Sequence, residues 1–199
     1  MLVNILAGVL GILIFLFVFW KRLKEDYSSE IIFQTAAAVL AGIGLGWFLA
    51  VLFLPAWFFW AAMLGAIFAM FLMRVRFKLR FYETLEALIL ASMPWISLIF
   101  LENSVNSSSL RSFLGFVIIL IMIFLSYWLD VSYKSFRWYK SGKVGFAGLS
   151  IAFIFFLTRT VLAILGITML SFVGKFEPVI SGVMTVVSFV LLLKLKNEQ

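Results

Sequence analysis

The sequence contains neither cysteine nor histidine, and only 13% of its 199 residues are charged. Without cysteine there are no disulfides and no thiol nucleophiles. Without histidine there is no imidazole base, and the usual ligand of zinc and haem is missing. We therefore expect neither a bound metal nor a cofactor. Any chemistry has to come from Arg, Lys, Glu, Asp, Tyr, Ser, Thr or Asn side chains.

Hydrophobic residues make up 65% of the chain, well above their share in soluble domains. They gather in seven stretches of about the length that crosses a bilayer core, which takes about 20 residues at 1.5 Å rise per residue. We predict an all-α polytopic membrane protein with one transmembrane domain over residues 1–199. The predicted spans are residues 2–20, 31–54, 57–73, 82–101, 110–129, 144–166 and 179–195.

Lysine and arginine are divided unequally between the two sides of these spans. Thirteen of the 16 follow the first, third, fifth and seventh spans, whereas only Arg111 and Lys175 lie in the alternate segments. The positive-inside rule then predicts an outside N-terminus and an inside C-terminus. The basic and aromatic segment from Asp130 to Lys143 is typical of an interface with anionic lipid. We therefore expect the net charge of +7 to face membrane lipids, and we expect no nucleic acid to bind.

Arg159 is the one formal charge in the sixth predicted span, VGFAGLSIAFIFFLTRTVLAILG. An arginine within a span costs at least ~2.5 kcal/mol on insertion scales, so it should face the protein interior, a wet cavity or a lipid headgroup. One interpretation is structural, because an arginine in the outer third of a helix can snorkel to the interface. The other is that Arg159 holds an anion, which we expect to be a lipid phosphate because a guanidinium binds a phosphate bidentately.

Four local features lead to further expectations about structure. Pro94 is expected to break the fourth span, and the polar stretch ENSVNSSS, residues 102–109, is expected to form an outer loop. Glu102 and Glu177 are the carboxylates near the outer face, and we expect both to be distant from Arg159. Gly42 and Gly46 form a G-x-x-x-G pair, which indicates close packing of two helices.

Five segments, in order along the chain, resemble motifs of one known family. They are GIGLGW (42–47), WAAMLGAIFA (60–69), KLRFYETLEAL (78–88), FLEN (100–103) and FFLTRTVLA (155–163). They are similar to G-A-R-L-G-Y, H-G-G-L-L-G-G-I-L-A, K-L-x-F-L-x-L-A-D-L, R-x-G-N and Y-G-L-F-R-F-L-x-E of the bacterial prolipoprotein diacylglyceryl transferases. Members of that family have seven helices and an outside N-terminus. They move a diacylglyceryl group from phosphatidylglycerol to the cysteine of a lipoprotein signal peptide.

The resemblance implies a site and a location. Arg159 and Asn103 match retained family positions and are implied to bind a lipid phosphate, with Glu102, Glu86 and Phe155 in support. The implied partners are a phospholipid, phosphatidylglycerol first, and a lipoprotein signal peptide. The implied location is the bacterial cytoplasmic membrane.

Most of the family's reacting groups are replaced in this chain, the signature histidine by Trp60 and the other polar positions by Gly44, Phe100, Phe155 and Ala163. We therefore assign no catalytic residue. An active transferase and a lipid-binding pseudoenzyme both stay open at this point. So do two other classes, a small transporter or channel, and a structural subunit that only packs against other membrane proteins.

Overall fold

The computed structural model describes residues 2–132, 145–169 and 171–197. Within them the fold is all-α, with no strand. Most of the basic and aromatic segment from Asp130 to Lys143 lies outside the described residues. So does Val144, the first residue of the predicted sixth span. The helices are α1 (Leu2–Leu23), α2 (Ser29–Phe53), α3 (Phe58–Phe77), α4 (Phe81–Ser107), α5 (Leu110–Ser132), α6 (Phe146–Ile164) and α7 (Glu177–Asn197), with 3₁₀ turns η1 (Pro55–Trp57) and η3 (Gly174–Phe176).

Each of the seven described α-helices belongs to a segment long and apolar enough to cross a membrane. A helix satisfies its own backbone hydrogen bonds, which is required where lipid replaces water. The chain is therefore a multi-pass membrane protein, as predicted. The orientation of its termini stays a prediction.

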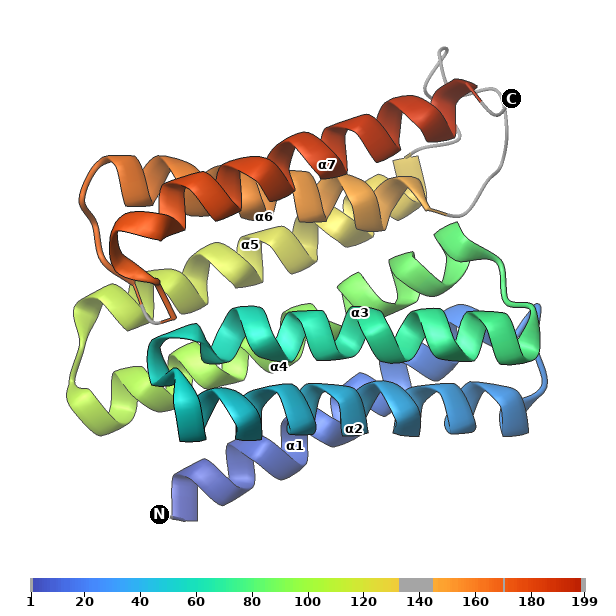
Figure 1. Ribbon diagram of the computed structural model, residues 1–199, viewed down its shortest axis with the longest axis horizontal. Helices are drawn as coiled ribbons and strands as arrows, with labels where there is room; N and C mark the ends of the chain where they lie inside the picture. Colours follow the sequence, from blue (N-terminus) through green and yellow to red (C-terminus); the bar gives the residue numbers. More distant parts are fainter. Residues whose placement is uncertain (1, 133–144, 170, 198–199) are drawn as a thin grey trace.

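Successive helices run in opposite directions, so the molecule has two ends (Figure 1). One end holds Arg159, the start of α7 and the α4–α5 turn, and we call it the Arg159 end. The other holds Arg74, Arg76 and Arg80, and we call it the basic end. All candidate site residues except Glu86 lie at the Arg159 end.

Helix α4 is the central element, in contact with α1, α3, α5 and α6. In Figure 1, α5, α6 and α7 lie on one side of it and α1 and α2 on the other, while α3 crosses it in this view. Two apolar clusters fill the spaces beside α4: one includes Phe15, Phe19 and Met70, and the other includes Ile119 and Phe155. The second cluster surrounds the candidate site.

Two expectations about α4 are wrong. The helix continues through Pro94, because a membrane helix tolerates a proline where its surroundings accommodate the backbone carbonyl that the missing N–H leaves free. The stretch from Glu102 to Ser107 is also helical rather than a loop, and only Ser108 turns, with a left-handed φ of 48°. Polar residues continue a helix beyond the apolar core because water can satisfy their side chains.

The predicted glycine pair packs two helices of this chain together. A Cβ on Gly42 would overlap the Gly65 carbonyl oxygen, and one on Gly46 would overlap the Ala61 carbonyl oxygen. The G-x-x-x-G pair is therefore used between α2 and α3.

Candidate functional site

Arg159 lies near the C-terminal end of α6 and is buried, with 5% of its surface exposed. The surrounding helix is apolar, and its residues pack toward α4 and α7. The guanidinium therefore faces the protein interior, which is one of the environments expected for an arginine within a span. It does not snorkel into solvent.

The partner of Arg159 is Glu177, the first residue of α7, which is fully buried. Arg159 Nε donates to Glu177 Oε1 at 2.8 Å, and a terminal guanidinium nitrogen lies 2.6 Å from the same oxygen. The expectation that Glu177 is distant from Arg159 is wrong. α6 and α7 form a hairpin, so that 18 residues of chain separate two side chains that touch.

Glu177 is also held by three other donors. Trp60 Nε1 and the Val173 backbone N–H each donate to Oε2 at 3.1 Å, and Ser181 Oγ donates to Oε1 at 2.7 Å. Five polar contacts thus reach this one carboxylate. A buried charge is tolerated when it is paired and hydrogen-bonded in this way.

The remaining guanidinium donors of Arg159 bind the segment between α6 and α7. One terminal nitrogen donates to Ser171 Oγ at 3.1 Å and the other to the Ser171 carbonyl at 3.2 Å. Ser171 has a left-handed φ of 74°, and Gly166 and Gly174 on either side of it are also left-handed. The polar bonds of Arg159 therefore fix a sharply turning segment over the end of α6.

Aromatic rings cover the rest of the guanidinium. Its central carbon lies 4.2 Å from the ring centroid of Phe59, 4.8 Å from that of Phe172, and within 6 Å of Trp60 and Phe155. Such distances are those of cation–π contacts. These rings come from α3, α6 and the α6–α7 segment, so Arg159 joins three parts of the fold.

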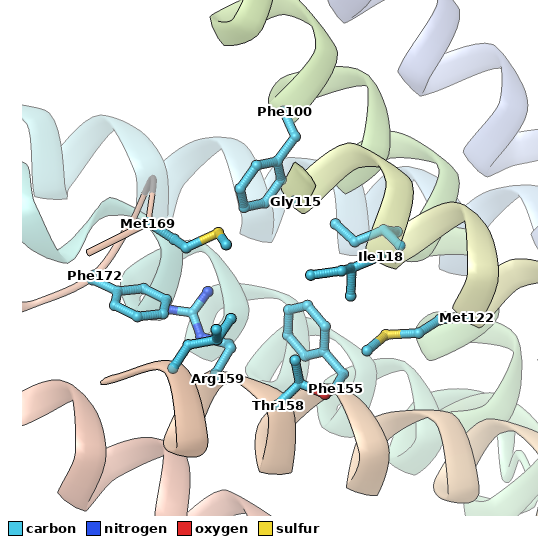
Figure 2. Close-up of a pocket in the computed structure, with 11 residues that line it drawn as sticks. Phe100, Gly115, Ile118, Met122, Phe155, Thr158, Arg159, Met169 and Phe172 are labelled. Carbon is cyan, nitrogen blue, oxygen red and sulfur yellow. The ribbon is translucent and has the colours of Figure 1, made fainter. Parts of the chain in front are cut away.

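Beside Arg159 is a small, partly open apolar groove, and Figure 2 shows the side chains that line it. Its wall includes Phe100 of α4, Gly115 and Met122 of α5, Phe155 of α6, and Met169 of the α6–α7 segment. Among the described residues that line it, Arg159 is the single charged one. The cavity measures about 30 Å³, which is room for about one water molecule.

The other predicted site residues have separate partners. Asn103 Nδ2 donates to Ser112 Oγ at 2.6 Å and so ties α4 to α5, and in the described chain no hydrogen bond joins Asn103 to Arg159. Glu102 is half-buried near the end of α4. Phe155 does meet Arg159 and lines the groove.

Glu86 lies near the basic end, at the opposite end of the molecule from Arg159. Its carboxylate is buried and accepts the backbone N–H groups of Gly145 at 2.5 Å and Gly148 at 3.2 Å. It therefore caps the N-terminus of α6, where a negative charge complements the helix dipole. Of the predicted set, the structure brings together Arg159 and Phe155 alone.

A second polar network joins two turns at the basic end. Tyr27 Oη donates to Glu83 Oε2 at 2.9 Å and accepts the backbone N–H of Arg80 at 2.9 Å, while the Arg80 guanidinium donates to Glu83 Oε1 at 2.9 Å. Burial raises the pKa of Tyr27 above its ordinary value of 10.0, and the bond to Glu83 acts in the same direction. The hydrogen bond from the Arg80 backbone N–H lowers the pKa of Tyr27 and so partly offsets these two effects.

Sequence reasoning missed Glu177 and Ser171 as partners of Arg159. The available signal was the rule that an intramembrane charge needs a partner, which directs attention to the nearest acid along the chain. Among the described residues, no group of three acidic side chains that could hold a metal is present.

Comparisons with protein-family models, with characterised proteins and with solved structures gave no match to this chain. The resemblance to the diacylglyceryl transferases therefore stays a prediction that rests on the motifs quoted above.

Proposed function

We propose that this membrane protein binds a phospholipid, with an acyl chain in the groove between α5 and α6 beside Arg159. The observation that carries the proposal is an apolar, half-open groove in which Arg159 is the single charged residue among the described lining residues, on helices long and apolar enough to cross a membrane. Ligand sites have this composition, mostly apolar walls with a few placed polar groups.

The groove has to widen to take an acyl chain, because a volume of about 30 Å³ is smaller than a few methylene groups. Met122 and Met169 line it, and methionine is the apolar side chain that repacks most readily. Ile118, Thr158 and Leu162 are partly exposed and mark the open side, between α5 and α6. A chain entering there comes directly from the surrounding lipid.

The ion pair limits what Arg159 contributes. Glu177 neutralises the guanidinium, and Ser171 takes further donors, so a phosphate at Arg159 has to share or displace these bonds. Displacement leaves a buried carboxylate unpaired, which is costly. Arg159 therefore acts as a fixed wall of the groove, and it binds a phosphate only where that phosphate shares or displaces these bonds.

Diacylglyceryl transfer requires a base that generates a thiolate, besides cations that stabilise the leaving phosphate. Glu177 is engaged by five polar contacts and is not free to take a proton. We therefore propose lipid binding without transfer. An assay of the purified chain with phosphatidylglycerol and a lipobox peptide tests this, and formation of diacylglyceryl-peptide would contradict it.

The groove is tested by filling it. Thr158→Phe places a ring in the groove, whereas the matched control Val161→Phe places the same ring on the exposed side of α6. We expect Thr158→Phe to reduce the lipid retained by the purified protein in native mass spectrometry and the control to retain as much as the wild type. Equal retention by all three proteins would discard the groove as a lipid site.

A further inference from the structure

Arg111 is a second cation beside the groove, at the Arg159 end. It is the second residue of α5 and is exposed. One of its terminal nitrogens donates to Thr168 Oγ1 at 3.1 Å, in the segment between α6 and α7. Among residues 2–132, 145–169 and 171–197, no acidic side chain forms an ion pair with it.

The position of Arg111 follows from the geometry of α5. Gly115 lines the groove four residues later, and residues four apart share one face of a helix, about 6 Å apart along its axis. Figure 2 shows Gly115 close to Phe100, at the edge of the groove. Arg111 therefore lies one turn beyond the groove, toward the start of the span.

The depth of Arg111 in the membrane fits a lipid phosphate. The segment of α5 that is long and apolar enough to cross a membrane begins at Leu110, so its composition assigns Arg111 to the boundary between the hydrocarbon core and the headgroups. An acyl chain in the groove would have its headgroup at this level.

The local electrostatics favour an anion at the same place. The first turn of α5 contains no acidic residue, and the N-terminal end of a helix already carries a partial positive charge. Arg111 adds a full positive charge where the helix dipole disfavours one. An anion bound there complements both.

Arg111 differs from Arg159 in availability. Arg159 is neutralised by buried Glu177, whereas the bond between Arg111 and Thr168 joins a cation to a neutral hydroxyl and leaves further guanidinium donors. A guanidinium binds two phosphate oxygens in parallel. Binding by Arg111 therefore breaks no ion pair among the described residues.

We propose that Arg111 binds the phosphate of an anionic phospholipid whose acyl chain lies in the groove, and so gives the site its preference for lipids with net negative charge. This inference rests on the proposed function and adds to it the headgroup residue and the lipid class. Thr168 contributes its hydroxyl to the same phosphate.

The test compares retention of dimyristoyl phosphatidylglycerol and phosphatidylcholine by the full-length protein in neutral detergent, measured by native mass spectrometry. The wild type should retain phosphatidylglycerol in preference. Arg111→Gln should reduce that preference about tenfold, the factor that one charge-assisted hydrogen bond of about 1.5 kcal/mol supplies. Arg111→Lys should reduce it less, because the charge remains and the bidentate geometry is lost.

Lys175→Gln is the matched control. Lys175 is exposed at the same end, and its neighbour Phe176 contacts Trp57, on the α3 side of the molecule. The control removes one positive charge and should keep the preference of the wild type. If it loses as much preference as Arg111→Gln, or if Arg111→Gln loses none, the assignment of Arg111 is overturned.

The same measurement separates the two proposals. Equal retention of both lipids by the wild type, above that of the groove-filled Thr158→Phe variant, would overturn the role of Arg111 and leave the groove as a lipid site. Retention of neither lipid above that variant would overturn the proposed function itself.

Discussion

Arg159 Nε donates to Glu177 Oε1 at 2.8 Å, and the carboxylate that receives it is fully buried. The pair joins the end of α6 to the start of α7. Trp60 extends the connection to α3 through its own bond to Glu177. The buried charge that the sequence marks as exceptional is thus the centre of a junction between three helices.

Removing either member of this pair should destabilise the protein strongly. Arg159→Met leaves a buried carboxylate without its counter-ion, and Glu177→Gln leaves a buried guanidinium. We expect each to lower the free energy of unfolding by about 3–5 kcal/mol, measured by equilibrium denaturation in mixed micelles. Arg22→Gln, at the partly exposed Arg22–Asp130 pair, is the control and should cost less than about 1 kcal/mol.

The double variant Arg159→Met with Glu177→Gln combines the two single substitutions and separates pairing from packing. If the ion pair is the cause, the double variant loses clearly less than the sum of the two single losses, because neither charge is left alone. A double variant that loses the full sum would mean that the two side chains act independently.

The sequence predicts the spans well because a membrane helix is specified by one property, a run of apolar residues about as long as the bilayer is thick. The ends of the helices are less well predicted. Residues 102–107 continue α4 although their polarity is typical of a loop, since polarity does not prevent a helix from continuing beyond the apolar core. Pro94 lies inside α4 although helix propensity predicts a break there, because membrane helices tolerate proline where their surroundings accommodate the freed backbone carbonyl.

The candidate site was predicted less completely than the fold. Burial of Arg159 follows from its position in an apolar run, but its partner depends on how α6 and α7 turn back on each other. That turn is made by residues with left-handed backbone, Gly166, Ser171 and Gly174, in a segment without periodicity. Asn103 and Glu86 are polar and near helix ends, and there they tie helices together through Ser112 and the start of α6.

Gly65 should tolerate no side chain. A Cβ there would overlap the Gly42 carbonyl oxygen, a backbone atom of α2 that cannot move without separating α2 from α3. We expect Gly65→Ala to lower the free energy of unfolding by about 1–3 kcal/mol. Gly44→Ala is the control, since nothing lies within 4 Å of its Cβ, and it should be neutral or stabilising. Similar stabilities for the two variants would show that α2 and α3 do not pack this closely.

Tyr27 should make stability depend on alkaline pH. Its pKa is raised in the folded protein, so the folded state holds the phenol proton more tightly than the unfolded state does. The contribution is complete below the ordinary pKa of 10.0 and is lost as the pH rises through the folded pKa. Tyr27→Phe should cost about 1 kcal/mol at pH 8. The difference in unfolding free energy between wild type and Tyr27→Phe should then shrink above pH 10. A difference that grows would mean that the folded state favours the ionised phenol, contrary to this prediction.

Glu86 should hold the first turn of α6 closed. Its carboxylate accepts two backbone N–H groups, from Gly145 and Gly148, that have no acceptor within the helix. Glu86→Ala removes both bonds at a cost of about 1–2 kcal/mol, the value of a helix cap. We expect amide hydrogen exchange at Gly148 to become about tenfold faster, as this loss implies if exchange proceeds through opening of that turn. Glu102→Gln, which changes a half-buried carboxylate of the same helix, should leave this exchange unaltered. Unchanged protection in Glu86→Ala would mean that the helix start is held by packing, and that the buried carboxylate has another use.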